Sequence, residues 1–212
     1  MLAGVKAKAI LPVLLMLVFA ASRYPGVMPP NFSATYALMF CAGVFFPPRL
    51  AAWLPLATLL VTDLLLNGLY YHAPLLSPEM LGNYLAYAAL LWLGRRFRPG
   101  SPFLGLLGGG ILGALLFYLV TNTFAWLFNP YHNPEYTRTL AGWIIALTKG
   151  TAGYPQTWEF FRNTLISGGL FSGLFAGAMK LLDAPEPKEA EEPADEAPAA
   201  EPAGETPQEA KA

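Results

Sequence analysis

LAAWLPLATLLVTDLLLNGL, residues 50–69, decides the class of fold. As a helix with a rise of 1.5 Å per residue, a stretch of about 20 apolar residues crosses the ~30 Å hydrocarbon core of a bilayer. Its only charged residue is Asp63, and a carboxylate at that depth costs at least ~2.5 kcal/mol on insertion scales. Asn67 lies one helical turn further on, so both polar side chains share a helix face. We therefore expect Asp63 to face a partner, a proton or a water-filled cavity instead of lipid.

The composition places the whole chain among membrane proteins with several spans. Of its 212 residues 55% are hydrophobic and 13% are charged, whereas soluble domains average about 25% charged residues. Residues 1–182 carry 11 Lys and Arg against 4 Asp and Glu, and residues 183–212 carry 2 against 10. The second segment is almost all Ala, Pro and Glu and cannot bury a core. We therefore predict a transmembrane domain over 1–182 and a disordered, acidic, cytoplasmic tail over 183–212.

Five further apolar segments complete a predicted all-α bundle of six transmembrane helices. They cover residues 7–22, 32–46, 80–94, 103–128 and 160–182. Proline pairs at 29–30 and 47–48 end the helices that precede them, and Pro55 predicts a kink within residues 50–69. The connection over 129–159 is polar and aromatic, and a short interfacial helix is expected within it at 136–147.

The first apolar segment has two interpretations. Lys6 and Lys8 precede an apolar centre that ends in small residues, which is also the pattern of a cleaved signal peptide. We favour an uncleaved helix, because the following segments need a partner to bury against.

The distribution of basic residues predicts the orientation, since cytoplasmic loops carry the excess of Lys and Arg. With a cytoplasmic N-terminus, the inner side holds seven basic residues and the outer side four: Lys6, Lys8, Arg49, Arg95, Arg96, Arg98 and Lys180 against Arg23, Arg138, Lys149 and Arg162. We expect a multi-pass protein of a bacterial cytoplasmic (inner) membrane, surrounded by lipid, with both termini in the cytoplasm.

This topology places every strongly polar intramembrane side chain in the outer half of the bundle. Amides and carboxylates that face lipid are costly, so we expect them to converge on the bundle axis around a pocket open to the exterior. The predicted substrate-binding residues are Asn31, Ser33, Asp63, Asn67, Asn83, Tyr87, Tyr118, Asn122, Trp126 and Asn163. A neutral or cationic solute would suit an ionised Asp63.

Each of these residues also has a structural interpretation. Tyr and Trp near an interface anchor helices in the membrane, and single Asn or Ser side chains bond helix to helix. For Asp63 the structural alternative is an ion pair with Arg162 or Arg23 at the outer rim. Small-residue faces at Gly109 and Gly113, and at 169, 173 and 177, permit close approach of backbones, either within the bundle or against a partner subunit.

The sequence gives no catalytic or metal-binding pattern. His72 and His132 lie near acidic residues but without a ligand spacing, and no nucleophile and base occur at a readable spacing. We therefore expect no enzyme, no cofactor, no metal and no nucleic-acid partner.

Short motifs at the predicted helix ends carry a resemblance to a known family. They are Asn31-Phe32-Ser33-Ala34, Pro55-Leu56, Asp63-Leu64, Asn83-Tyr84, Thr121-Asn122 with Trp126, and Phe160-Phe161-Arg162-Asn163-Thr164. With these motifs, residues 20–182 resemble the substrate-binding S components of energy-coupling factor (ECF) vitamin transporters. The chain resembles more closely an uncharacterised bacterial family of S-component-like membrane proteins.

The resemblance implies six helices, both termini inside, and an outward-facing pocket for a small-molecule substrate. It also implies docking through the first helix onto an ECF-type coupling subunit driven by ATPases. Ala3-x-x-x-Ala7 is similar to the small-residue docking motif, although it lies early in the chain. The alternative is a structural or assembly protein of the membrane whose acidic tail recruits cytoplasmic partners.

Overall fold

The computed structural model describes residues 2–183 and is all-helical, as predicted; no β-sheet occurs in this range. The predicted tail, from residue 184 on, lies outside the described residues. Seven α-helices and one π-helical turn follow one another as α1 Leu2–Ser22, α2 Thr35–Phe45, α3 Pro48–Leu65, η1 Leu66–Tyr70, α4 Pro78–Gly94, α5 Phe103–Phe128, α6 Leu140–Thr148 and α7 Thr157–Asp183.

Within residues 2–183, three segments are long and apolar enough to cross a membrane: Pro48–Tyr70, Phe103–Phe128 and Thr157–Leu182. Pro12–Ser22 and Thr35–Phe45 are apolar but shorter. The outer face of α1 is exposed and wholly apolar at Val13, Leu14 and Leu17, which suits a helix surrounded by hydrocarbon.

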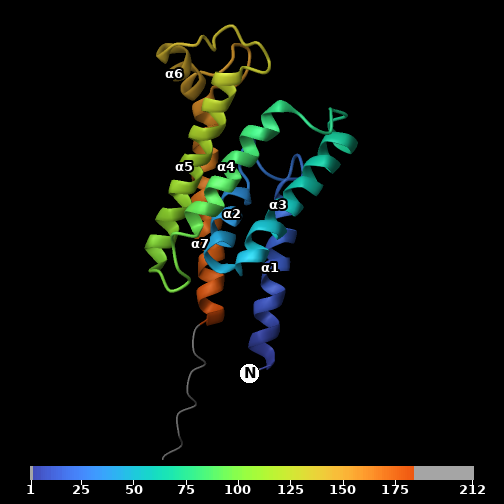
Figure 1. The fold of residues 1–212 in the computed structure, drawn as a ribbon, viewed down its shortest axis with the longest axis vertical. Helices are drawn as coiled ribbons and strands as arrows, with labels where there is room; N and C mark the ends of the chain where they lie inside the picture. The colour runs from blue at the N-terminus through green and yellow to red at the C-terminus, as the bar shows by residue number, and fades with distance from the viewer. Residues whose placement is uncertain (1, 184–212) are drawn as a thin grey trace, which may run out of the picture.

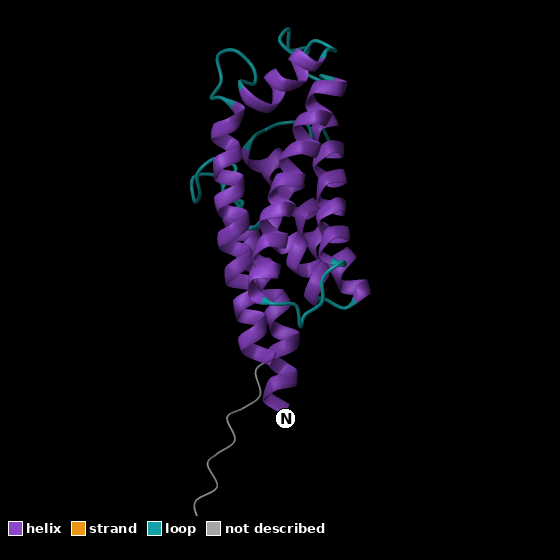
Figure 2. Cartoon of the chain, turned by 90° about the vertical axis from the view of Figure 1, so that its left-hand side faces the viewer, coloured by secondary structure: helices purple, strands orange, loops and turns teal. Residues whose placement is uncertain are grey.

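The helices run alternately between the two ends of the molecule (Figure 1). Both described ends of the chain lie at the lower end in Figure 1, and the loops after η1 and α5 lie at the upper end. The same arrangement is seen from the side in Figure 2, where the helices form one elongated bundle.

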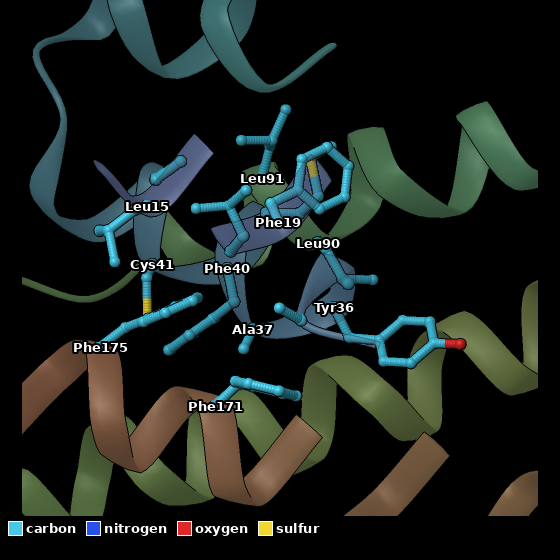
Figure 3. Close-up of a cluster of buried hydrophobic side chains, with 14 of the residues drawn as sticks. Leu15, Phe19, Tyr36, Ala37, Phe40, Cys41, Leu90, Leu91, Phe171 and Phe175 are labelled. Carbon is cyan, nitrogen blue, oxygen red and sulfur yellow. The ribbon is translucent and has the colours of Figure 1, made fainter. Parts of the chain in front are cut away.

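Helix α2 is the centre of the core. All of its residues from Thr35 to Val44 are buried, and other helices surround it. Phe40 and Cys41 pack with Phe19 of α1, Leu90 of α4 and Phe171 of α7, among others (Figure 3). A helix that is apolar all round must be enclosed by protein or lipid, and here protein encloses it.

Small residues let these helices approach closely. A Cβ atom added at Gly94 of α4 would collide with the carbonyl oxygen of Phe40 in α2, and one at Gly168 of α7 would lie 2.6 Å from Cβ of Ala114 in α5. The face formed by residues 169, 173 and 177 also packs on α5 side chains. The glycine faces therefore pack within the bundle, which was the first of the two interpretations of these motifs.

Several predicted boundaries shift by a few residues. Helix α2 begins at Thr35 instead of residue 32, because Pro29, Pro30 and the left-handed Asn31 (φ 58°) hold the preceding chain in a loop. Pro78 occupies the first turn of α4, where a missing N–H costs nothing. The interfacial helix begins later, at Leu140, and the Thr139 hydroxyl accepts a bond from the N–H of Gly142 at 3.1 Å. Helix α3 continues through Pro55.

Candidate functional site

The loop between α1 and α2 is partly exposed, with Tyr24 and Val27 among its exposed residues. With 11 residues, α2 is only about 16 Å long, so the loop that precedes it stops short of the upper ends of the longer helices. Figure 1 shows this blue loop between α4 and α3, lower in the view than the upper ends of both helices. Three prolines, at 25, 29 and 30, keep it non-helical.

This loop lines a cavity of about 600 Å³, which we call the loop cavity. Its wall consists of loop residues between Ser22 and Ser33, together with Thr35, Tyr36, Tyr71 and Tyr87. The Tyr36 ring packs at the edge of the core, and Figure 3 shows its hydroxyl directed away from the apolar cluster. The cavity therefore combines apolar walls with hydroxyl and backbone groups, which is the usual make-up of small-molecule sites.

Hydrogen bonds fix the polar part of this wall. The Tyr36 hydroxyl donates to the carbonyl of Asn31 over 3.3 Å, and the hydroxyls of Ser33 and Thr35 are 2.6 Å apart. The ring of Tyr87 stacks on Phe117 with centroids 5.1 Å apart. These contacts position three predicted site residues, Asn31, Ser33 and Tyr87, around one space.

Asp63 forms an ion pair behind the wall. Arg23 donates from Nη2 to Asp63 Oδ1, and the Tyr84 hydroxyl donates to Asp63 Oδ2 over 3.0 Å. The two charged side chains are only 18% and 15% exposed. Asp63 thus pairs with one of the two arginines that the structural alternative named. It is not among the residues that line the loop cavity.

Arg23 is the link between this ion pair and the cavity, which it lines. Its guanidinium also lies 5.8 Å from the ring centroid of Phe19. The second terminal nitrogen, Nη1, is buried and has no hydrogen-bond partner among the residues that the structure describes. One strong donor of the arginine is therefore left without an acceptor.

Three further predicted residues, Asn163, Asn67 and Asn83, do not line the loop cavity. Asn163 of α7 donates from Nδ2 to the carbonyl of Pro30 over 2.9 Å, which ties the loop to α7. Asn67 donates to the carbonyl of Leu75 over 3.4 Å. Asn83 is half-buried in α4. Asn163 thus supports the cavity, and Asn67 stabilises the chain that follows η1.

Of the remaining three predicted residues, Asn122 lines a second cavity of about 570 Å³, which we call the cap cavity, whereas Tyr118 and Trp126 do not line it. Asn122 lines it with residues of the connection between α5 and α7, among them Tyr136 and Thr151. Tyr118 donates from its hydroxyl to the carbonyl of Leu147, and Trp126 donates to the carbonyl of Thr137 over 2.6 Å. Tyr118 and Trp126 therefore hold the α6 region over the ends of α5 and α7.

Two acidic side chains, Glu79 and Glu135, lie near the connection between α5 and α7, which we call the cap region. Burial first, and the Glu79 carboxylate second, raise the pKa of Tyr131 to about 12. Glu135 accepts a hydrogen bond from the N–H of Ala152 over 3.3 Å. The acids of this region thus stabilise connecting loops.

The structure divides the predicted pocket into two cavities. Tyr118 faces α7, where its ring lies 4.3 Å from that of Phe161, whereas Tyr87 faces the loop cavity. Helical spacing predicted which side chains share a helix face, but not that Tyr118 and Tyr87 are directed to different neighbours. Sequence reasoning missed Arg23 and Tyr36 as wall residues, and the isolated charge of Arg23 beside a proline-rich loop was the available signal.

Comparison with known proteins gives one positive result. The model of a family of unknown function (DUF6580) matches residues 4–190, which is most of the chain. No curated protein matches the chain, and no solved structure matches it. The chain therefore belongs to this family of unknown function, DUF6580.

Proposed function

We propose that the protein is a solute-binding subunit for uptake across the bacterial inner membrane. In this proposal six helices span the bilayer as in an ECF-type S component, both termini are cytoplasmic, and the loop cavity opens outward. The observation that carries it is the proline-rich loop that lies lower than the upper ends of α3 and α4 in Figure 1 and lines a cavity of about 600 Å³.

A non-helical loop at the depth of the membrane needs a physical explanation. Non-helical backbone at membrane depth is tolerated only where it is buried in protein or lines a water-filled cavity. Several residues of the loop from Arg23 to Ala34 line the loop cavity, and in Figure 1 the loop lies lower than the upper ends of α3 and α4. A structural protein has no need of a polar cavity beneath its outer surface, whereas a receptor for a small solute does.

The coupling partner belongs to the same proposal. The exposed apolar face of α1, with Val13, Leu14 and Leu17, is the surface we assign to lipid and to an ECF-type coupling subunit driven by ATPases. The glycine faces of α5 and α7 are occupied within the bundle, so they are not the docking surface. The predicted docking pair Ala3 and Ala7 lies in α1, before the residues whose side chains are described.

Thermal unfolding tests the binding function. The full-length protein in lipid nanodiscs is heated with each member of a panel of water-soluble metabolites. A solute at about 100 times its dissociation constant stabilises the protein by about 2.7 kcal/mol. Ser33→Trp fills the loop cavity and should abolish that stabilisation, whereas the matched change Thr151→Trp fills the cap cavity and should leave it intact.

Two results would overturn this proposal. One is that no metabolite shifts the unfolding temperature of the wild-type protein. The other is that stabilisation is lost in Thr151→Trp and retained in Ser33→Trp, which would move binding to the cap cavity.

A further inference from the structure

We infer that the loop cavity takes a small organic anion, whose carboxylate or phosphate group pairs with Arg23. This inference rests on the proposed function and names its substrate class. It reverses the expectation from sequence that Asp63 would select a neutral or cationic solute.

The charge of the cavity wall is positive, which bears on the charge of the solute. Among the residues that line the loop cavity, Arg23 is the only one with a charged side chain. The other polar side chains of the wall are uncharged hydroxyls and amides, including those of Ser33, Thr35 and Tyr87. A cavity whose single charge is positive favours an anion over a cation.

The second argument is that Asp63 is already occupied. Its Oδ1 accepts from Arg23 and its Oδ2 accepts from Tyr84 over 3.0 Å. Since the carboxylate is also absent from the cavity wall, it does not offer a bond to a solute. Asp63 is therefore a positioning residue, which holds the guanidinium of Arg23 at the wall.

The third argument is the unpaired nitrogen of Arg23. Nη2 is used on Asp63, and Nη1 is buried without an acceptor. A buried charged donor without a partner is costly. Because Arg23 lines the loop cavity, a small rotation of its guanidinium would bring Nη1 to the cavity, where an oxygen of a bound solute supplies the acceptor. Guanidinium groups bind carboxylates and phosphates strongly because they offer N–H donors in a planar fork.

The remaining wall residues indicate the chemistry of the rest of the solute. Phe32, Met28 and the prolines provide apolar surface, and the ring of Tyr87 lies on the opposite element, α4. The matching solute has one anionic group at Arg23 and a compact apolar or aromatic body.

Charged thiol reagents test the sign of the cavity without knowledge of the solute. In full-length protein with Cys41→Ala, the variant Ser33→Cys places a thiol in the loop cavity, and Thr151→Cys places one in the cap cavity. We expect the ratio of modification rates, anionic sulfonatoethyl over cationic trimethylammonioethyl methanethiosulfonate, to be about tenfold higher at Ser33 than at Thr151. An equal ratio at both positions, or a preference for the cation at Ser33, would overturn the inference.

Removing the ion pair checks that Arg23 is the cause. Arg23→Gln with Asp63→Asn removes both charges together, so neither is left unpaired in the bundle. The reagent ratio at Ser33 should then fall to that of the control position. A ratio unchanged in this double variant would assign the selectivity to another group and overturn the inference.

A binding experiment separates this inference from the proposed function. Wild-type protein in nanodiscs is titrated with aromatic and aliphatic carboxylates, the matching phosphate esters, amides and amines, and inorganic phosphate. We expect binding of a carboxylate or an organic phosphate, and several-fold weaker binding in Asp63→Asn, where the guanidinium of Arg23 is no longer held at the wall. Binding of amines that Asp63→Asn abolishes would overturn the anion class and leave the receptor function standing. Binding of inorganic phosphate alone would also overturn the organic class, and failure of every solute would overturn the receptor function itself.

Discussion

Asp63 shows how the chain carries a carboxylate through an apolar helix. The ion pair with Arg23 and the hydrogen bond from Tyr84 occupy both of its oxygens. Removing one partner of a buried ion pair costs about 3–5 kcal/mol, since it leaves the other charge uncompensated. Arg23→Gln or Asp63→Asn alone should therefore lower the free energy of unfolding by about 3–5 kcal/mol. The double change, which removes both charges, should lower it by less.

The hydrogen bond between Tyr84 and Asp63 should be measurable by a double-mutant cycle. We expect Tyr84→Phe and Asp63→Asn to be coupled by about 1 kcal/mol, as polar pairs between membrane helices are. The cycle is measured by reversible unfolding in mixed micelles. Tyr154→Phe, at an exposed tyrosine of the cap loop, serves as control and should show no coupling to Asp63→Asn. Additive effects of the Tyr84 and Asp63 changes would mean that this bond is not formed.

The partner of Asp63 could be predicted from the sequence only in part. The cost of a buried carboxylate predicted that Asp63 needs a partner, and Arg23 was one of two candidates. Helical spacing could not decide between them, because the answer depends on the path of the α1–α2 loop, which brings Arg23 to Asp63. That path follows from the prolines of the loop and the shortness of α2, which act together only in the folded chain.

At the scale of elements, glycine positions divide into those that touch another helix and those that do not. A Cβ at Gly110 of α5 would collide with the side chain of Ser172 in α7, whereas one at Gly108 would meet open space. Both glycines lie in the same helix, one turn or less apart. Alanine substitutions at these two positions therefore distinguish the effect of close packing from the effect of helix propensity.

Gly110→Ala should destabilise the bundle, because α5 and α7 must separate to admit the methyl group. Gly108→Ala should instead stabilise by up to about 1 kcal/mol, since alanine is the better helix former. Unfolding temperatures in detergent measure both changes. Ser172→Gly should restore the stability of Gly110→Ala, and absence of this rescue would contradict the contact between the two positions.

Helices were more predictable than their ends. Apolar runs between prolines predicted all the long elements, since hydropathy and chain length constrain a helix in lipid. The start of α2 was missed because Asn31 adopts a left-handed conformation, which a short asparagine side chain tolerates. Helix α6 begins after Thr139, whose hydroxyl caps its first turn. A threonine alone does not show in the sequence where a helix begins.

On the scale of the whole molecule, the helices alternate in direction and return the chain to the end where it began (Figure 1). Three of the described segments are long and apolar enough to cross a membrane. Alternation and the distribution of basic residues lead to the orientation we propose, with the cap and the loop cavity toward the exterior.

Thiol labelling in intact cells tests this orientation. In the Cys41→Ala background, Ala152→Cys in the cap loop should react with a membrane-impermeant maleimide added outside. Gly100→Cys, in the loop between α4 and α5 where a side chain meets open space, should react only after the cells are opened. The reverse pattern would invert the orientation, and labelling of both positions from outside would contradict the alternating path.

Native mass spectrometry shows whether the loop cavity holds a small solute. The full-length protein is released from nanodiscs after exposure to a small-molecule extract of the producing cells. We expect a discrete small-molecule adduct on wild-type protein and on Thr151→Trp, and its loss in Ser33→Trp. An adduct retained in Ser33→Trp, or no adduct on any of the three proteins, would contradict this expectation.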